Sequence, residues 1–373
     1  MRTTADVVII GGGIQGVSAL YYLAESGIRN TVLVEMDKLA SGTTAYTAGW
    51  IMLQQPRREQ MQLSQISFAE FRSFEDKFGV DIGFRQKGSL SINTIGHSDE
   101  MRERAQLQKS LGIPVKILTA SEIKSMAPIL NVSDIELGLY CEEDGVVDAN
   151  AIVYAYSKAA KLLGAEVEEG VKAIDIIVQN AKVIGVKTTR GLIATPFVVN
   201  AAGIYAKEVG KWIGLDIPIT NALRHIVVTD LLIPEDMPLI EVLNPVQIYI
   251  GSTGGRADYT VGSFETDRFE HKPDLMLLIK THLDDLMHRA PALAEAGIVT
   301  CTAGIRSLTP DGLPILGPVE EVSGYINDCG WGGTGISHGP AGGQVIAECI
   351  AGTSNLPVSI EPFLMKRFQT AKT

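Results

Sequence analysis

The chain has 373 residues, of which 46% are hydrophobic, and its 43 acidic and 32 basic side chains give a formal net charge of −11. A chain of this length and apolar content can bury a large core and exceeds one ordinary domain, so we expect a soluble globular protein with two domains. The acidic balance disfavours nucleic acid and anionic membranes as partners.

The sequence also lacks the marks of a membrane or disulfide-stabilised protein. No uninterrupted apolar stretch reaches the roughly 18 residues of a membrane span, and no cleavage region of a signal peptide precedes the first apolar run, so we expect a cytoplasmic protein. Its cysteines are far apart and form no C-x-x-C pair, which favours reduced thiols and no metal site. They are Cys141, Cys301, Cys329 and Cys349.

The first predicted elements are a strand at residues 7–10 and a helix that follows it at once. Gly11, Gly13 and Gly16 stand between them in G-x-G-x-x-G spacing. Glycines allow a tight turn and close approach of a phosphate to the backbone, and the free N–H groups of the helix start favour negative charge. The pattern predicts a pyrophosphate site, with a plain glycine-rich turn as the alternative.

A second apolar run, residues 31–34, supports the same interpretation. It ends in Glu35, about 20 residues beyond the glycines, where a carboxylate accepts hydrogen bonds from an adenosine ribose. Strand, glycines, helix, strand and terminal acid in this order favour a dinucleotide site. They do not distinguish FAD from NAD.

The middle of the chain alternates helical and β-rich patterns. Residues 41–49 form a loop of small and hydroxyl side chains, and phenylalanines at helical spacing between residues 68 and 78 indicate one apolar helix face. A strand is expected at 88–93, and helices at 97–109 and 149–163. Three β-rich runs between residues 165 and 203 predict a hairpin followed by a return to the first sheet.

Two stretches near the C-terminus contain turn-forming residues and glycines. Residues 304–317 read GIRSLTPDGLPILG, and residues 329–350 form a second glycine-rich loop that opens a helix. This second loop is another place where backbone N–H groups can face negative charge. Glycine-rich loops at both ends of the chain predict a cofactor domain assembled from separate segments.

In their order these segments resemble the D-amino-acid oxidase superfamily of FAD enzymes, and most of all its glycine oxidase and sarcosine oxidase branch. That branch includes the flavin subunits of heteromeric opine, proline and sarcosine oxidising complexes. The segments are VVIIGGGIQG, TVLVE, SGTTAYTAG, FVVNAAG, AGIRSLTPDGLPILG and GWGGTGISHGPAGG. The last two are more specific than the glycine fingerprint, and they favour FAD over NAD.

The resemblance implies an α/β fold with a discontinuous, Rossmann-like FAD-binding domain and a second, α+β substrate domain built on a mixed β-sheet. The FAD-binding domain is expected to comprise residues 1–50, 145–220 and 300–373. The substrate domain is expected to comprise residues 51–144 and 221–299.

The resemblance also implies which residues contact FAD. Glycines of the first turn face the pyrophosphate, Glu35 the ribose, and the second glycine-rich loop the pyrimidine edge of the flavin. The implied set is Gly11, Gly13, Ile14, Gln15, Gly16, Glu35, Met36, Ser41, Thr43, Thr44, Ala48, Gly49, Val171, Ala201, Ala202, Gly203, Arg306, Gly332, Gly333, Thr334, Gly335 and Ile336.

Three residues are implied on the substrate side. Arg306 matches the arginine that pairs with the substrate carboxylate, for which a guanidinium offers a fork of donors; a structural salt bridge is the alternative. Tyr249 matches a tyrosine that often meets the same carboxylate, although a packed sheet tyrosine is equally compatible. His225 and His338 are candidates for orienting substrate or taking a proton, or for purely structural roles.

The reaction implied is FAD-dependent oxidation of an amino acid or secondary amine, such as glycine, sarcosine, proline or an opine. Electrons pass to oxygen or a redox partner, and further subunits of a heteromeric complex are conceivable. Gly304 stands where covalent flavoproteins of this branch carry a cysteine, so the FAD is expected to dissociate. Alternatives are a glycine oxidase of thiazole synthesis, a flavin electron-transfer subunit and an NAD-dependent dehydrogenase.

Overall fold

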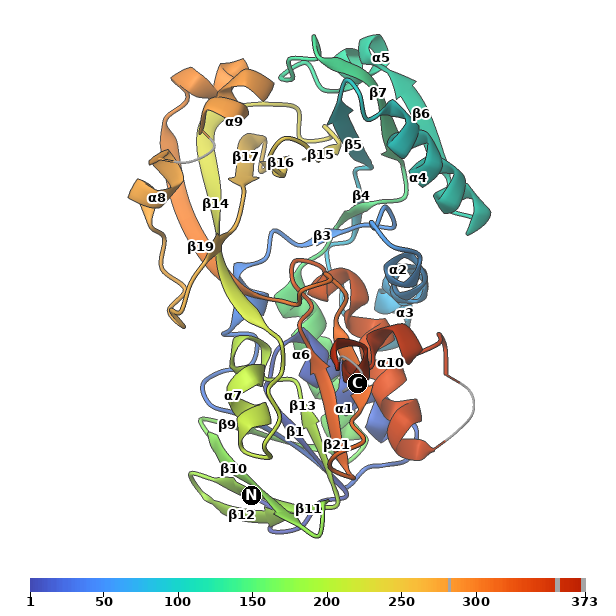
Figure 1. The fold of residues 1–373 in the computed structure, drawn as a ribbon, viewed down its shortest axis with the longest axis vertical. Helices are drawn as coiled ribbons and strands as arrows, with labels where there is room; N and C mark the ends of the chain where they lie inside the picture. The colour runs from blue at the N-terminus through green and yellow to red at the C-terminus, as the bar shows by residue number, and fades with distance from the viewer. Residues whose placement is uncertain (281–282, 353–355, 370–373) are drawn as a thin grey trace.

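The computed structural model describes residues 1–280, 283–352 and 356–369. Two large β-sheets lie toward opposite ends of the longest axis of the molecule (Figure 1). Between them, a short sheet of β3 (Trp50–Ile51), β8 (Gly145–Val146) and β4 (Arg85–Gln86) lies where the chain passes from one part to the other.

The first sheet is built around the strand that precedes the glycine-rich turn. Its strand order is β20-β21-β13-β1-β2-β9, and all neighbours are parallel except β20, which is antiparallel to β21. The strands are β1 (Val7–Ile10), β2 (Thr31–Glu35), β9 (Glu166–Glu169), β13 (Phe197–Asn200), β20 (Ile315–Pro318) and β21 (Tyr325–Cys329).

Both faces of this sheet are covered, which explains why β1 is apolar at every position. Val7 and Ile9 pack into a core with the helices α1 (Ile14–Glu25), α6 (Ala149–Leu162) and α10 (Gly335–Ala351). Val8 and Ile10 pack on the other face against a three-stranded sheet. The strands of that small sheet are β10 (Ala173–Gln179), β11 (Lys182–Thr188) and β12 (Gly191–Ala194).

The second sheet is mixed, because β15 runs parallel to β5 while the other pairs are antiparallel. Its order is β18-β14-β17-β16-β15-β5-β7-β6, and β19 pairs with β14. The strands are β5 (Ser89–Thr94), β6 (Val115–Thr119), β7 (Ile135–Cys141), β14 (Thr220–Leu232), β15 (Leu239–Val242), β16 (Ile248–Thr253), β17 (Arg256–Val261), β18 (Phe264–Glu265) and β19 (Ile298–Leu308).

The two faces of the second sheet differ in polarity. Val227, Ile240 and Ile250 point into a hydrophobic core with α5 (Ala120–Met126) and with Leu278 and Leu286, which lie on two helices further along the chain. Because side chains alternate along a strand, their neighbours Ile226, Glu241 and Tyr249 point to the opposite face. That opposite face borders the cavity described below. The remaining helices here are α8 (Leu275–Lys280) and α9 (Leu283–Arg289).

Most local predictions are confirmed, with one difference. The expected strand at residues 88–93 is β5, and the expected helices are α4 (Ser98–Ser110) and α6. The phenylalanine-rich helix is instead two helices that meet at Ser73, since the chain leaves helical geometry there. These are α2 (Arg58–Arg72) and α3 (Phe74–Phe78). A further helix is α7 (Ala206–Lys211). The short helical turns are η1 (Thr43–Tyr46), η2 (Gly203–Tyr205), η3 (Pro291–Glu295), η4 (Glu361–Phe363) and η5 (Met365–Phe368).

The predicted fold class is confirmed: a largely parallel α/β sheet is joined to a second unit built on a mixed sheet. Residues 1–50, 145–220 and 300–373 each contribute strands to the first sheet, as expected of a discontinuous domain. Strand β19 crosses the expected boundary at residue 300 and pairs with β14 of the second sheet. The boundaries themselves stay a prediction.

Candidate active site

A single cavity of about 660 Å³ connects the glycine-rich turn after β1 with the polar face of the second sheet. Its lining includes the start of α1, the end of β2, the loop before α10, and side chains from β14, β15, β16, β17 and β19. One cavity therefore joins the predicted nucleotide end to the predicted substrate residues.

At the nucleotide end, the glycines are required by close backbone packing. Gly11 has φ +112°, and a Cβ on it would lie 2.4 Å from the carbonyl oxygen of Ala201. A Cβ on Gly16 would lie 2.0 Å from the carbonyl oxygen of Gly11. These contacts bring β1, β13 and α1 together, and they leave the N-terminus of α1 open toward the cavity.

Glu35 stands at the end of β2 and is held by backbone donors. Its Oε2 accepts the N–H of Gly12 at 2.7 Å, and Oε1 accepts the N–H of Asp37 at 2.8 Å. Burial raises the pKa of this carboxyl, while the two backbone hydrogen bonds oppose that rise. The carboxylate is thus fixed beside the glycine turn, with lone pairs left for a further donor.

Hydroxyl side chains from η1 join the two sheets. Thr44 Oγ1 accepts the N–H of Ile14 at 3.2 Å, which caps one free donor of α1. Thr43 Oγ1 donates to the carbonyl oxygen of Ile305 on β19 at 2.7 Å. The loop at residues 41–49 therefore forms one wall of the cavity and ties the substrate-side strand to the nucleotide end.

The second glycine-rich loop brings another helix start to the same cavity. Gly332, Gly333 and Thr334 line it, and α10 begins at Gly335. The side-chain amide of Gln15, on α1, donates to the carbonyl oxygen of Gly335 at 2.9 Å. The N-termini of α1 and α10 therefore lie together and present their free N–H groups and positive dipole ends to one ligand.

Arg306 lies on β19 and lines the substrate side of the cavity. Among the described residues, its guanidinium has neither a hydrogen-bond nor an ion-pair partner. Burial, together with the nearby guanidinium of Arg224, lowers the pKa of Arg306 to about 9. A carboxylate placed there would supply the missing counter-charge and accept two parallel hydrogen bonds.

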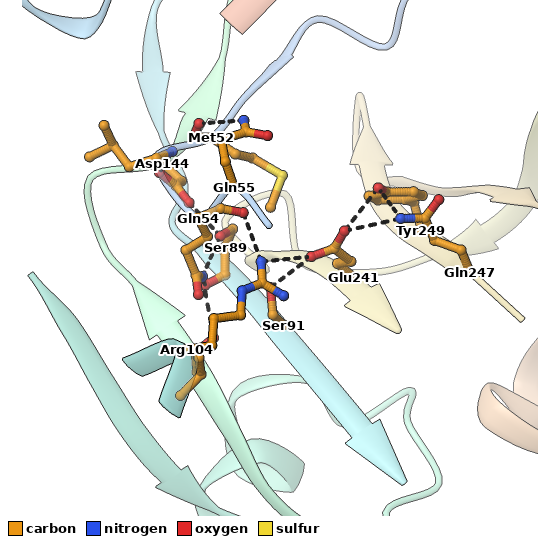
Figure 2. A network of polar contacts seen from close by, with 12 residues as sticks. Met52, Gln54, Gln55, Ser89, Ser91, Arg104, Asp144, Glu241, Gln247 and Tyr249 are labelled. Atoms are coloured by element: carbon orange, nitrogen blue, oxygen red, sulfur yellow. Dashed lines mark hydrogen bonds and ion pairs between the residues drawn. The ribbon is translucent and has the colours of Figure 1, made fainter. Parts of the chain in front are cut away.

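Tyr249 belongs to a hydrogen-bond network on the cavity wall (Figure 2). Its hydroxyl donates to Glu241 Oε1 at 2.9 Å and accepts from the Gln247 amide at 2.8 Å. Glu241 Oε2 accepts from Ser91 at 2.9 Å and lies 3.5 Å from Arg104 Nη2. Burial, and then the charge of Glu241, raise the pKa of Tyr249. The tyrosine proton is thus committed to Glu241 and not to a ligand.

The network continues behind the cavity wall to Asp144. Arg104 donates to the carbonyl oxygen of Gln54 at 2.8 Å, and the Gln54 amide donates to Ser89 Oγ at 2.7 Å. Ser89 in turn donates to Asp144, whose pKa burial raises to about 7. Linked and largely satisfied polar groups of this kind hold side chains in one arrangement.

Aromatic pairs close the cavity where the nucleotide side meets the second sheet. His271 stacks on Tyr46 with ring centroids 4.4 Å apart, and its Nδ1 accepts the N–H of Ile305 at 3.0 Å. Burial lowers the pKa of His271, so the ring is neutral and carries its proton on Nε2. Phe269 stacks on Tyr205 in the same way, with centroids 4.7 Å apart.

The structure brings most of the predicted site residues together. Those that line the cavity are Gly11, Gly13, Ile14, Gln15, Glu35, Met36, Ser41, Thr43, Thr44, Ala48, Ala201, Ala202, Gly203, Tyr249, Arg306, Gly332, Gly333, Thr334, Gly335 and Ile336. Gly16, Gly49, Val171 and His225 lie outside the lining. Gly16 and Gly49 instead allow close backbone packing, and Val171 donates its N–H to the carbonyl oxygen of Glu35.

The two candidate histidines are buried away from the cavity. His225 Nε2 accepts the N–H of Asp274 at 2.8 Å. His338 lies within α10, where its Nε2 is 3.0 Å from Ser64 Oγ, and burial lowers its pKa to about 3. Neither lines the cavity, so a role of His225 or His338 in orienting substrate or taking a proton stays a prediction.

Sequence reasoning missed several cavity residues, most of them on the second sheet and the segments beside it. They are Tyr46, Trp50, Arg104, Arg224, Glu241, Gln247, Asp258, Thr260, Phe269 and His271. Arg224 directly precedes His225 in a strand, and alternation places the two on opposite faces. The strand pattern could therefore have indicated Arg224, whereas the others depend on how distant strands pair.

A family profile described as FAD dependent oxidoreductase matches residues 6–349. The chain belongs to the FAD dependent oxidoreductase family. FAD is therefore its cofactor, and the prediction of FAD over NAD is confirmed.

Individual relatives of this FAD dependent oxidoreductase agree with the family. Human mitochondrial sarcosine dehydrogenase is 32% identical over 369 residues, which cover 94% of this chain and 40% of that protein. Sarcosine oxidase subunit beta from Arthrobacter sp is 26% identical and is matched over 92% of its length. The crystal structure of L-proline dehydrogenase from P. horikoshii superposes with a TM-score of 0.89 at 26% identity, covering 99% of both chains.

The chain spans 40% of the length of the human sarcosine dehydrogenase that it matches. Within the described ranges, no helix is both long and apolar enough to cross a membrane.

Proposed function

We propose that this FAD dependent oxidoreductase oxidises a primary or secondary amine whose neighbouring carbon carries a carboxylate. The observation that carries this proposal is Arg306, an unpaired cation in the wall of the cavity. It lies on the same cavity as two helix N-termini, so an acid held by Arg306 would be next to the bound cofactor.

The cavity fits FAD at its nucleotide end. The close backbone packing at Gly11 and Gly16 sets the tight turn from β1 into α1, so that Gly11, Gly12 and Gly13 line the cavity where a pyrophosphate would lie. Glu35 is fixed where it could accept the ribose hydroxyls, and the start of α10 would face the flavin. We also propose that the other predicted cofactor residues contact FAD, and that FAD binds without a covalent bond to the chain.

When bound, FAD supplies a two-electron acceptor for a hydride from the substrate carbon. The chain's own residues would hold the substrate: the Arg306 fork binds the carboxylate and fixes the adjacent C–H bond. The amine must be neutral so that its lone pair assists loss of the hydride. An imine results, and water converts it to a carbonyl compound and ammonia or a smaller amine.

No residue is required as an obligatory base in this scheme. Tyr249 would act through its packing and its bond to Glu241, because its proton already has an acceptor. The preoriented N–H groups at the start of α10 would stabilise negative charge that develops on the cofactor. Electrons then pass to oxygen or to a redox partner.

A second candidate function follows from the Arthrobacter relative, which is a subunit of sarcosine oxidase. In this case the chain would carry flavin within a heteromeric complex. It would transfer electrons, while the amine substrate would be oxidised in another subunit. Both functions use the same FAD site. They differ in whether an amine alone reduces the isolated chain.

The experiment that separates them is an anaerobic screen in which amines are mixed with the FAD-loaded chain and flavin bleaching is recorded. The panel contains glycine, sarcosine, proline, opines and, as a control, amines without a carboxylate. Bleaching by a carboxylate-bearing amine supports the first function. Full retention of oxidised flavin with every amine contradicts it and favours the electron-transfer subunit.

Arg306 is tested within the same assay. Arg306→Met should lower kcat/KM for a carboxylate substrate about 30-fold to 1,000-fold, and Arg306→Lys should fall between it and the wild type. Oxidation of an amine without a carboxylate should change little. Wild-type rates and affinity in Arg306→Met would assign the arginine a structural role.

A further inference from the structure

Besides Arg104, which is paired with Glu241, two further arginines border the substrate side of the cavity. Arg306 of β19 pairs with Ala222 of β14, and Arg224 of β14 pairs with Gly304 of β19. Directly paired residues of antiparallel strands point to the same face, and so do residues two apart on one strand. Arg224 and Arg306 are therefore diagonal neighbours on the cavity face, and both line the cavity.

Arg224 is held in place by neutral groups. It is 3% exposed, its Nε donates to Thr260 Oγ1, and its Nη1 donates to Gln247 Oε1 at 3.3 Å. Its guanidinium lies 4.6 Å from the ring centroid of Tyr249. Within the described part of the chain, Nη2 is buried without a hydrogen-bond partner. The side chain is thus held in position without a direct ion pair, and Glu241 acts on its charge only from a distance.

The acidic groups on the same wall are already engaged. Glu241 accepts from Tyr249, Gln247 and Ser91, and it forms an ion pair with Arg104. Asp258 accepts from Thr253 at 2.9 Å, and burial raises its pKa. Among the described residues, no carboxylate lies within 4.0 Å of Arg224 or Arg306.

Arg224 is buried and Arg306 is half-buried, and two neighbouring cations that repel each other and have no direct ion pair are costly to a protein unless a ligand supplies negative charge. We propose that the substrate carries two carboxylates, of which Arg306 binds one and Arg224, with Gln247 and Thr260, receives the second. This inference rests on the proposed function, since it names the substrate class of the same site.

The strand geometry limits the spacing of the two carboxylates. Diagonal neighbours on paired strands have Cα atoms about 7–8 Å apart, and guanidinium groups can converge from that separation. Short amino dicarboxylates and imino dicarboxylates match this spacing. One carboxylate lies next to the oxidised carbon, and the other lies a few bonds away.

The test compares isosteric pairs in which one carboxylate is replaced by a neutral amide. The probes are iminodiacetate and its monoamide, aspartate and asparagine, and glutamate and glutamine, each amino acid in both enantiomers. Dissociation constants are measured by calorimetry on the oxidised, FAD-loaded chain without oxygen, and flavin bleaching is recorded in parallel. In at least one pair, the dicarboxylate should bind about 30-fold or more tightly than its amide.

The variants separate Arg224 from Arg306. In Arg224→Gln, the dissociation constants of the dicarboxylate and its amide should become nearly equal, while the amide still binds. Arg224→Lys should keep part of the difference between the two dissociation constants. Arg289, buried in an ion pair with Asp134 away from the cavity, offers a control for loss of a buried arginine. Arg289→Gln should leave the ratio unchanged, whatever it does to stability.

The outcomes distinguish this inference from the proposed function. If every pair binds with equal affinity, or if Arg224→Gln weakens both members equally, the second-carboxylate site is overturned, whether or not amines bleach the flavin. If a dicarboxylate binds selectively through Arg224 but no amine bleaches the flavin, the dicarboxylate site stands and the proposed oxidation fails.

Discussion

Gly333 leaves the space that the guanidinium of Arg306 occupies. A Cβ at position 333 would lie 2.9 Å from Arg306 Nη1 and 3.1 Å from its Cζ. The second glycine-rich loop therefore does more than open α10, because it also sets the position of the unpaired cation on β19. The second glycine-rich loop and Arg306 are therefore packed against each other, and this packing links the nucleotide end of the cavity to its substrate side.

Gly333→Ala should consequently displace Arg306 while leaving the fold intact, since the atom it meets is the end of a flexible side chain. We expect kcat/KM for a carboxylate substrate to fall about tenfold or more, with a change in stability below about 1 kcal/mol. In an Arg306→Met background, Gly333→Ala should lower kcat/KM only a little further. Equal losses in both backgrounds would show that Gly333 does not act through the arginine.

Two glycines at the nucleotide end provide a matched pair. Alanine in place of a helical glycine usually stabilises a helix by about 1 kcal/mol. Gly16→Ala should do the reverse and destabilise by at least about 2 kcal/mol, because its Cβ meets the Gly11 carbonyl oxygen. Gly42, unlike Gly16, lines the cavity, and a Cβ there would meet nothing within 4 Å. In urea unfolding, the free energy of unfolding of Gly42→Ala should be close to that of the wild type.

The glycine turn and Glu35 could be predicted from sequence because their partners are local. The strand, the tight turn and the beginning of the helix all lie within about 30 residues, so their spacing alone predicts that Gly11, Gly13 and Glu35 lie at the same end of the cavity, as they do. Glu241, Gln247 and His271 could not be found in this way. Their positions depend on the register of paired strands and on long loops, and one sequence does not encode these as a short-range pattern.

Glu35→Ala should weaken FAD binding at least about tenfold. It removes the acceptor of two backbone N–H groups, those of Gly12 and Asp37, as well as the proposed ribose contact. The dissociation constant is measured by fluorescence quenching of added FAD. The unfolding free energy of the FAD-free protein serves as the control, because a purely structural role would lower it without a matching change in FAD affinity.

Denaturation with acid should release the flavin as free FAD. None of the four cysteines lines the cavity, whereas Gly304, where the resemblance predicts the cysteine of covalent members, does line it. A Cβ at Gly304 would lie 2.8 Å from Tyr46 Cβ, so a larger side chain has no room there. A yellow precipitate with a colourless supernatant would contradict non-covalent binding.

His225 and Arg224 illustrate a second limit of the sequence. A histidine in ALRHIVVTD is a reasonable candidate for proton transfer, and the preceding arginine is easily passed over. In β14 the period of two places Arg224 on the cavity face and His225 on the other, where it accepts the Asp274 N–H. The apolar run after His225 indicates a strand, but which of its faces borders the cavity was fixed by the pairing of β14 with β19.

His338 gives a prediction about pH that does not involve the cavity. It is buried in α10 against Ser64 of α2, and burial lowers its pKa from 6.5 to about 3. The unfolded chain therefore binds a proton at this histidine below about pH 6.5, whereas the folded chain does not. Because the unfolded state then binds more protons, stability is present above that pH and is lost as the pH falls.

For His338 alone, the free energy of unfolding should decrease by about 2 kcal/mol between about pH 8 and pH 5. His338→Gln keeps a polar group that can reach Ser64 but cannot titrate, so this part of the decrease should disappear. His225 and His271 also have pKa values lowered by burial, and they contribute equally to both proteins. Urea unfolding of the FAD-loaded proteins at several pH values isolates the difference. Parallel curves for wild type and His338→Gln would mean that the folded protein accommodates a charged His338, for example by admitting water beside α10.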